Sequence, residues 1–169
     1  RPATAMLALS DALAIATMHL RGFTREDFAR FHPSGALGKR LLLTVADVMR
    51  PIGDIAVVAP AVTTIDVIRS MTTSAVGAAC IVTPECELVG LVSESDLRKH
   101  LLNHSDPLAA PVDDLMNASP STISPELLAV EALEVFQNFP VKIGEIPVVE
   151  EGKLVGLLVL KDLLRSGIL

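Results

Sequence analysis

A pattern that occurs twice constrains the fold of this chain more than any single motif. The segment 88–98 recurs 66 residues later, and both Gly90 and Asp96 find their equivalents, Gly156 and Asp162, at that offset (156 − 90 = 162 − 96 = 66). Agreement of two positions fixes the register of the repeat. Each copy of such a repeat is expected to be one supersecondary unit that buries its apolar face against its neighbour.

Within each copy the sequence predicts the order strand, helix, strand, strand, helix, which is an α/β (α+β) fold. The strands are expected at 55–58, 79–82 and 88–92 and at 122–123, 146–149 and 154–159. A short acidic turn separates the last two strands, and the closing helices begin near Asp96 and Asp162. In the second copy the earlier helix is predicted to bury a face that repeats at helical spacing. That face consists of Leu128, Ala132, Val135 and Phe139.

The residues before the repeats do not resemble a self-sufficient domain. Residues 4–21 are rich in helix formers and apolar almost all round, which predicts a helix buried in a larger body. Gly22 is expected to end this helix and Thr24 to cap the next one. Because the sequence begins with Arg1 and not with Met, we expect it to be part of a longer chain.

Composition argues against several partners. The net charge is −6, no dense Lys/Arg stripe is present, and only 3% of the residues are aromatic, so nucleic acid is not an expected partner. Apolar runs such as 12–18 are far shorter than the roughly 20 residues of a membrane span, and no secretory signal opens the chain. These features predict a cytoplasmic protein without a membrane partner.

The thiols and imidazoles do not suggest a metal site. Cys80 and Cys86 fit no common zinc spacing and are expected to be reduced structural thiols. His19, His100 and His104 are not spaced to assemble a metal site with acids or thiols. No metal and no required cofactor are therefore expected.

Two units with the pattern Gly-apolar-apolar-[Ser/Thr]-x-x-Asp before a helix resemble a tandem pair of cystathionine-β-synthase (CBS) domains, a Bateman module. The resemblance covers about residues 45–169. It implies two repeats packed about a pseudo-two-fold axis, with two clefts that take adenine nucleotides or related ligands and regulate an attached enzyme or transporter. The expected divisions are CBS repeat 1 at 45–104, a linker at 105–112 and CBS repeat 2 at 113–169.

The preceding residues 1–44 resemble the end of a sugar isomerase (SIS) domain. The segments 10–14, 21–24, 26–29 and 32–42 are similar to those of arabinose-5-phosphate isomerases, in which a CBS pair follows directly. That family interconverts ribulose 5-phosphate and arabinose 5-phosphate on the pathway to Kdo, a lipopolysaccharide sugar. His32 matches a catalytic histidine, and an imidazole suits proton transfer near neutral pH. The chain alone is expected to be inactive, because the sugar-phosphate-binding part of the SIS domain would lie upstream.

Ser93 and Asp96 are the first candidates for a ligand site. The resemblance implies that the hydroxyl of Ser93 contacts a phosphate and that Asp96 accepts from ribose hydroxyls. The residues alone also fit a capping box, which stabilises a helix by about 1 kcal/mol and needs no ligand. Both interpretations stay open at this point.

The remaining candidates are implied by the same resemblance. Val159 stands in place of the hydroxyl in the second copy, so Asp162 is either a weaker ligand residue or a favourable charge at a helix N-terminus. Four residues just before the second strands are expected to line the clefts, although each also suits an ordinary turn. They are Gly77, Ala78, Ile143 and Gly144.

The sequence therefore predicts the regulatory, ligand-binding CBS pair of a sugar-phosphate aldose-ketose isomerase. The effector is expected to be an adenine nucleotide or CMP-Kdo. The expected protein partners are the chain's own SIS domain and further copies in a dimer or tetramer. The alternatives are a purely structural oligomerisation module with empty clefts and a CBS pair from another enzyme or a transporter.

Overall fold

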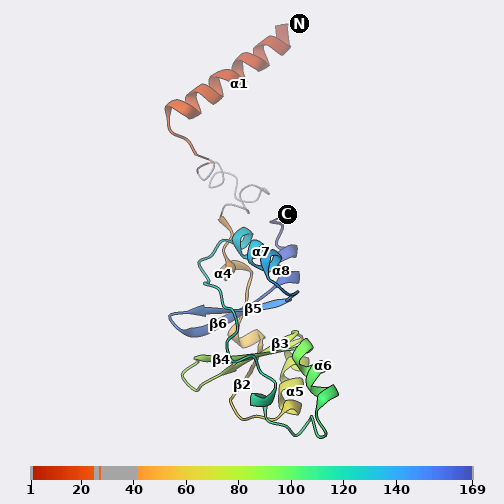
Figure 1. Ribbon diagram of the computed structural model, residues 1–169. Coiled ribbons are helices and arrows are strands. Elements are labelled where there is room, and N and C mark those ends of the chain that lie inside the picture. The colour runs from red at the N-terminus through yellow and green to blue at the C-terminus, as the bar shows by residue number, and fades with distance from the viewer. Residues whose placement is uncertain (1, 25–26, 28–41, 169) are drawn as a thin grey trace. The chain divides into compact units, whose positions relative to one another are not determined.

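A computed structural model describes residues 2–24, 27 and 42–168 (Figure 1). The chain divides into two compact units, Arg1–Leu42 and Leu43–Leu169. His32, the predicted catalytic histidine, lies outside the described residues.

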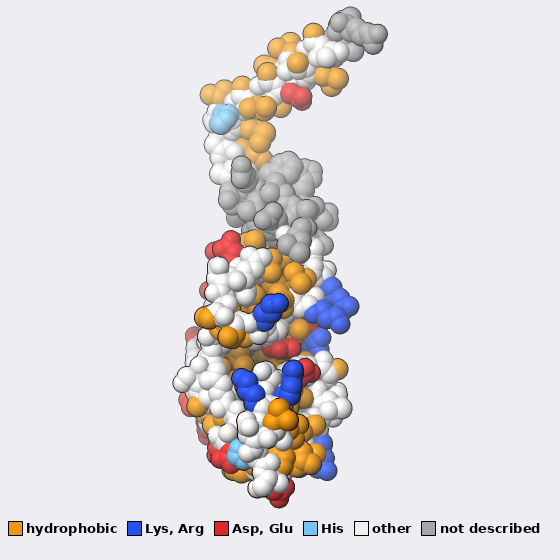
Figure 2. Space-filling view, turned by 45° about the vertical axis from the view of Figure 1, so that its right-hand side comes forward, with side chains coloured by type: hydrophobic (Ala, Val, Ile, Leu, Met, Phe, Trp, Pro, Cys, Tyr) orange, Lys and Arg blue, Asp and Glu red, His pale blue; other side chains and the backbone are white. Residues whose placement is uncertain are grey.

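The first unit contains helix α1 (Pro2–Leu20), as the sequence predicts. Gly22 ends it in a left-handed conformation (φ +62°), and the N–H of Phe23 donates to the carbonyl of Met18 at 2.9 Å. At the predicted cap the N–H of Asp27 donates to Thr24 Oγ1 at 3.2 Å, and the hydroxyl and N–H of Thr24 both donate to Asp27 Oδ2 at 3.0 Å. Figure 2 shows apolar side chains along much of α1. Its exposed large apolar residues include Met6, Leu7, Leu9, Leu13 and Ile15.

The first repeat contains a three-stranded sheet covered by helices, in the predicted order. Its elements are β2 (Ala56–Val58), α5 (Thr64–Ser74), β3 (Ala78–Val82), β4 (Leu88–Ser93) and α6 (Glu94–Asn103). β2 and β3 are parallel and β3 and β4 antiparallel, so the sheet order is β2-β3-β4. Every residue of β3 is buried, as expected for a central strand.

The second repeat follows the same plan with a shorter first strand. Its elements are the 3₁₀ turn η2 (Val112–Asp114), α7 (Ala129–Asn138), β5 (Glu145–Glu150), β6 (Lys153–Val159) and α8 (Leu160–Arg165). The strand predicted at 122–123 is reduced to a single parallel bridge between Ile123 and Val148. β5 and β6 are antiparallel, and the third strand of this sheet is β1 (Arg50–Pro51), which comes from the first repeat.

The two repeats exchange their leading segments. Helix α4 (Val45–Val48) lies beside α7 of the second repeat (Figure 1), and Val45 is fully buried in that repeat's core. In the opposite direction, Val112 is fully buried in the core of the first repeat, where its N–H donates to the carbonyl of Val62 at 2.8 Å. Each core is therefore built from one repeat and the leading segment of the other, as a pseudo-two-fold arrangement requires.

Glycines permit the close crossing of the exchanged segments. A Cβ atom at Gly156 would lie 2.5 Å from the carbonyl oxygen of Arg50 and 2.8 Å from Met49 Sδ. A Cβ atom at the equivalent Gly90 would lie 2.5 Å from Met116 Sδ. The repeated glycine of the sequence is thus explained by backbone approach, and the equivalent methionines pack over the two positions.

The face of α7 that the structure buries is not the face that the sequence predicts. The buried residues of this helix are Ala129, Ala132, Leu133 and Phe136. Leu128 and Phe139 have extended backbone and flank the helix as its caps, and Val135 is only half-buried. The helix therefore begins after Leu128, and its inward face follows the spacing i, i+3, i+4, i+7 from Ala129. Of the predicted face only Ala132 lies in the core.

Candidate functional site

The N-terminus of α6 carries the first pair of candidate residues. Ser93 is the last residue of β4 and the N-cap of α6. Its hydroxyl donates to Asp96 Oδ2 at 2.6 Å and its N–H donates to the same oxygen at 3.0 Å, while the N–H of Asp96 donates to Ser93 Oγ at 3.3 Å. The capping box is therefore confirmed. The role of these residues in ligand binding stays a prediction.

The equivalent carboxylate of the second repeat has a different partner. Val159, the N-cap of α8, makes no side-chain hydrogen bond to the helix. Asp162 Oδ2 instead accepts from Arg50 Nε at 2.7 Å, and Arg50 Nη1 donates to the carbonyl of Ala75 at 3.2 Å. The hydrogen bond with Asp162 raises the pKa of the guanidinium. The ion pair joins the leading segment of one repeat to the last helix of the other.

The predicted cleft residues of the first repeat lie next to Ser93. Ala78 is fully buried and is the strand partner of Ser93. The carbonyl of Gly77 accepts from the N–H of Glu94 at 3.0 Å. The start of β3 is thus fixed against the start of α6, so these residues meet at one point.

The second repeat shows the same local geometry. The carbonyl of Gly144 accepts from the N–H of Leu160 at 2.8 Å, which fixes the start of β5 against the start of α8. Ile143, just before it, is partly buried against the second core. The structure thus places Gly77 and Gly144 in equivalent positions, whereas Ala78 follows the first glycine and Ile143 precedes the second. The contact of these four residues with a ligand stays a prediction.

Glu145 joins the two repeats at this point. Its Oε1 would lie 2.6 Å from a Cβ atom at Gly77, so a larger residue there would have to displace the Glu145 carboxylate. Burial raises the pKa of Glu145, and nearby Glu94 raises it further, while a hydrogen bond from the backbone of Gly77 and the charge of Arg50 act in the opposite direction. The carboxylate therefore sits in a partly desolvated position close to three other groups of the cleft.

Sequence reasoning missed Arg50 and Glu145, although a signal was present. The strand pairing aligns Ala78 with Glu145, because Ala78 faces Ser93 and Glu145 faces Val159. Arg50 follows Met49 where Asn117 follows Met116. At both positions one copy is charged and the other neutral, and a residue-by-residue comparison of the copies would have found them.

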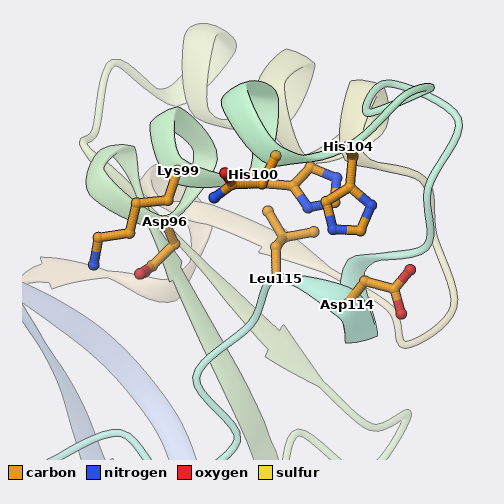
Figure 3. Close-up of a pocket in the computed structure, with 7 residues that line it drawn as sticks. Asp96, Lys99, His100, His104, Asp114 and Leu115 are labelled. Atoms are coloured by element: carbon orange, nitrogen blue, oxygen red, sulfur yellow. The ribbon is translucent and has the colours of Figure 1, made fainter.

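A small cavity lies beside α6 (Figure 3). It has a volume of about 210 Å³, below the roughly 300–1,000 Å³ of typical ligand pockets. Asp96 and Lys99 point to one side of Leu115, and the imidazole rings of His100 and His104 lie on the other side. Asn103 and Asp114 complete the lining. Of the predicted ligand-binding residues, only Asp96 lines this cavity.

His100 has a structural role in this part of the molecule. It is only 4% exposed, and its Nε2 lies 3.1 Å from the carbonyl oxygen of Pro107 in the segment between the repeats. Its ring centroid lies 4.0 Å from that of His104. His100 thus lies in the last turn of α6 and is covered by the segment between the repeats.

Two further cavities lie beside the helices. One, of about 550 Å³, is formed by α7 and the residues on either side of it, and one, of about 320 Å³, lies between α5 and α6. Neither is lined by a predicted ligand-binding residue. Among the described residues, no group of three His, Cys, Asp or Glu side chains is placed to hold a metal ion. In the same part of the chain, none of the helices has the length and hydropathy of a membrane span.

Comparison with curated proteins finds isomerases. The chain is 38% identical over 167 residues to the arabinose 5-phosphate isomerase KdsD of Pseudomonas aeruginosa, covering 98% of this chain and 51% of that protein. It is 37% identical over 164 residues to the arabinose 5-phosphate isomerase GutQ of Shigella flexneri, covering 96% of this chain and 50% of that protein. The chain thus spans about half the length of these relatives.

Comparison with solved structures finds the same fold. The structure of CBSX2 in complex with AMP has a TM-score of 0.63 and 27% identity, over 75% of this chain and 96% of that one. The AcuB protein of Vibrio cholerae has a TM-score of 0.66 and 24% identity, over 76% and 92%. The sequence pattern of the CBS domain family matches residues 45–103 and 112–168. The chain therefore belongs to the CBS domain family, as a pair of such domains.

Proposed function

We propose that this chain is the regulatory, ligand-binding CBS pair of a cytoplasmic arabinose-5-phosphate isomerase. The observation that carries the proposal is that the likeness to such isomerases covers 98% of the chain and thus extends into the residues that precede the CBS match. A CBS pair taken from a transporter or an unrelated enzyme would have no reason to share this segment.

The first unit supports an attachment to an SIS domain. Helix α1 has no acidic residue in its first turn and exposes large apolar side chains such as Leu7 (67%) and Leu9 (62%). Such a helix is stabilised by packing into a larger apolar body. The proposed partner is the SIS domain of the same polypeptide, in which His32 would act as the catalytic histidine. Further copies of the chain in a dimer or tetramer are the second proposed partner.

The proposed effector is an adenine nucleotide or CMP-Kdo, each of which presents ribose hydroxyls and phosphate. The AMP complex of CBSX2 supports the first, because that protein shares this fold. The hydroxyl of Ser93 and the carboxylate of Asp96, adjacent at the N-terminus of α6, suit a phosphate and a ribose hydroxyl. Both hydrogen bonds from Ser93 end on Asp96 Oδ2, so Oδ1 is free of hydrogen bonds from the described residues.

The test is a thermal-melt series of the 169-residue chain with AMP, ATP, CMP and CMP-Kdo. A ligand at 100 times its dissociation constant stabilises the folded state by about 2.7 kcal/mol, which raises the Tm of a chain of this size by roughly 5–10 °C. Asp96→Asn, which keeps the size of the side chain, is expected to remove the rise. No rise with any of the four compounds, in a chain that is a dimer or tetramer, would instead support the structural oligomerisation module.

A further inference from the structure

We infer that Arg50 closes one of the two clefts, so that the chain binds a single ligand, in the cleft of Asp96. This inference rests on the proposed function and names which of the two repeats binds the ligand. The two clefts would be equivalent if the repeats were identical. The structure shows a chemical difference at two coupled positions.

Arg50 and Asn117 occupy equivalent places relative to the two aspartates. Arg50 is the strand partner of Leu157, and Asn117 forms a bridge with Leu91 through hydrogen bonds of 3.0 and 2.8 Å. Leu157 lies as far before Asp162 as Leu91 lies before Asp96 (162 − 157 = 96 − 91 = 5). One cleft therefore has a guanidinium where the other has a neutral amide.

The guanidinium is held at both ends. Arg50 Nε donates to Asp162 Oδ2 at 2.7 Å, and Nη1 donates to the carbonyl of Ala75 at 3.2 Å. Both partners of the first bond are charged, whereas in a bond from a sugar hydroxyl to the same oxygen only the acceptor is, so the bond with Arg50 is the stronger of the two. The side chains of the pair are only 30% and 24% exposed. A ribose that approached Asp162 would have to displace a partner bound more strongly than itself.

Residue 159 is the second position at which the two clefts differ. Val159 stands where the first repeat has Ser93, so no hydroxyl is available to a phosphate. In the first repeat Asp96 is satisfied by the Ser93 hydroxyl, and in the second Asp162 is satisfied by Arg50. The two repeats thus satisfy the equivalent carboxylates differently, one through the Ser93 hydroxyl and the other through Arg50.

The charges around the two aspartates also differ. Asp162, Glu145 and Asp54 all lie close enough to act on the charge of Arg50, and Glu94 acts on Glu145. An anionic phosphate would meet these carboxylates while the guanidinium of Arg50 is already paired with Asp162.

The net charge of the side chains around Asp96 is closer to zero. The cavity that Asp96 lines contains the cation of Lys99 and two imidazoles beside one further carboxylate, Asp114. The Asp96 cleft is therefore the better place for an anionic ligand.

The experiment is isothermal titration of AMP into the full 169-residue chain and two matched variants. Wild type is expected to bind one AMP per chain. R50N/V159S gives the second repeat the residues of the first at these two positions, while Glu145 stays where the first repeat has Ala78, and it is expected to bind two. N117R places a guanidinium beside Asp96 and is expected to bind none, with circular dichroism and the melting transition showing that the variant is folded.

The outcomes separate this inference from the proposed function. If R50N/V159S binds no more AMP than a wild type that binds one, Arg50 does not close the cleft and the inference is overturned. If wild type binds no AMP but R50N/V159S binds one, the nucleotide-binding function of wild type fails while the role of Arg50 stands. Two AMP per wild-type chain would overturn the inference and leave the proposed function in place.

Discussion

Replacement of Gly156 by alanine tests the exchange of leading segments between the repeats. The new methyl group would lie 2.5 Å from the carbonyl oxygen of Arg50 and 2.8 Å from Met49 Sδ. The first contact is with backbone, which cannot swing aside as a side chain can. Since overpacking in a core costs about 1–3 kcal/mol, we expect a value near the upper end of that range.

A smaller opposing effect must be subtracted. Alanine is less flexible than glycine in the unfolded chain and is favoured in a strand by roughly 0.5–1 kcal/mol. The expected net loss for Gly156→Ala is therefore about 2 kcal/mol, or roughly 4–8 °C in Tm. Gly90→Ala provides the matched comparison, because its methyl group would meet the movable Sδ of Met116 at 2.5 Å and backbone only at 3.4 Å. For Gly90→Ala we expect a net loss below about 1 kcal/mol.

Urea denaturation of both variants gives the free energies of unfolding at constant m. Gly53→Ala is the control, because a Cβ atom there has no neighbour within 4 Å, and it should leave stability nearly unchanged. A loss for Gly90→Ala as large as that for Gly156→Ala would show that the backbone contact at Gly156 is not what makes the substitution costly. A Gly156→Ala variant as stable as the control would contradict the expected loss.

Three further changes test other parts of the structure. Glu145→Gln should stabilise the protein at pH 7. Because the pKa of Glu145 is raised in the folded state, the protonated carboxyl stabilises the fold fully below the unfolded pKa of about 4.3, and this stabilisation is lost as the pH rises through the folded pKa. In urea titrations near pH 4 the gain in the free energy of unfolding should vanish. An equal gain at pH 4 and at pH 7 would contradict this prediction. Burial raises the pKa of the Cys80 thiol to about 12, so at pH 8 only about 10⁻⁴ of it is thiolate. Iodoacetamide followed by mass spectrometry should therefore label Cys86 but not Cys80 until the chain is unfolded. Finally, Phe136→Ala should destabilise the fold by about 3–5 kcal/mol and Val135→Ala by less than about 1 kcal/mol, and the reverse order would show that the inward face of α7 is misassigned.

The repeat made most of the fold predictable, because each strand and helix could be checked against its copy. β3, β4, β5 and β6 lie within one or two residues of the predicted strands. The exchange of leading segments was not predictable, because it depends on which of two chemically similar cores buries Val45 or Val112. The face of α7 failed for a local reason, since an apolar residue at a helix cap has the same spacing signal as one inside the helix.

The sequence predicts only those parts of the candidate site at which the two copies match. Ser93 and Asp96 form the capping box that their spacing indicates. The remaining site residues, Arg50 and Glu145, lie where the copies differ, because each has a neutral equivalent in the other copy. Their partners are distant in sequence. Pairing of Arg50 with Asp162 across 112 residues follows from the crossing of β1 onto β6, which no local pattern shows.

An amide ¹H–¹⁵N NMR titration of the chain with AMP shows directly which cleft binds the nucleotide. If Arg50 closes the second cleft, the largest shifts fall on Ser93, Asp96 and Asn117, and the amides of Val159 and Asp162 are nearly unaffected. Shifts centred on Asp162 would show that the cleft behind Arg50 is the open one. The absence of any shift at millimolar AMP would show that this CBS pair does not bind the nucleotide.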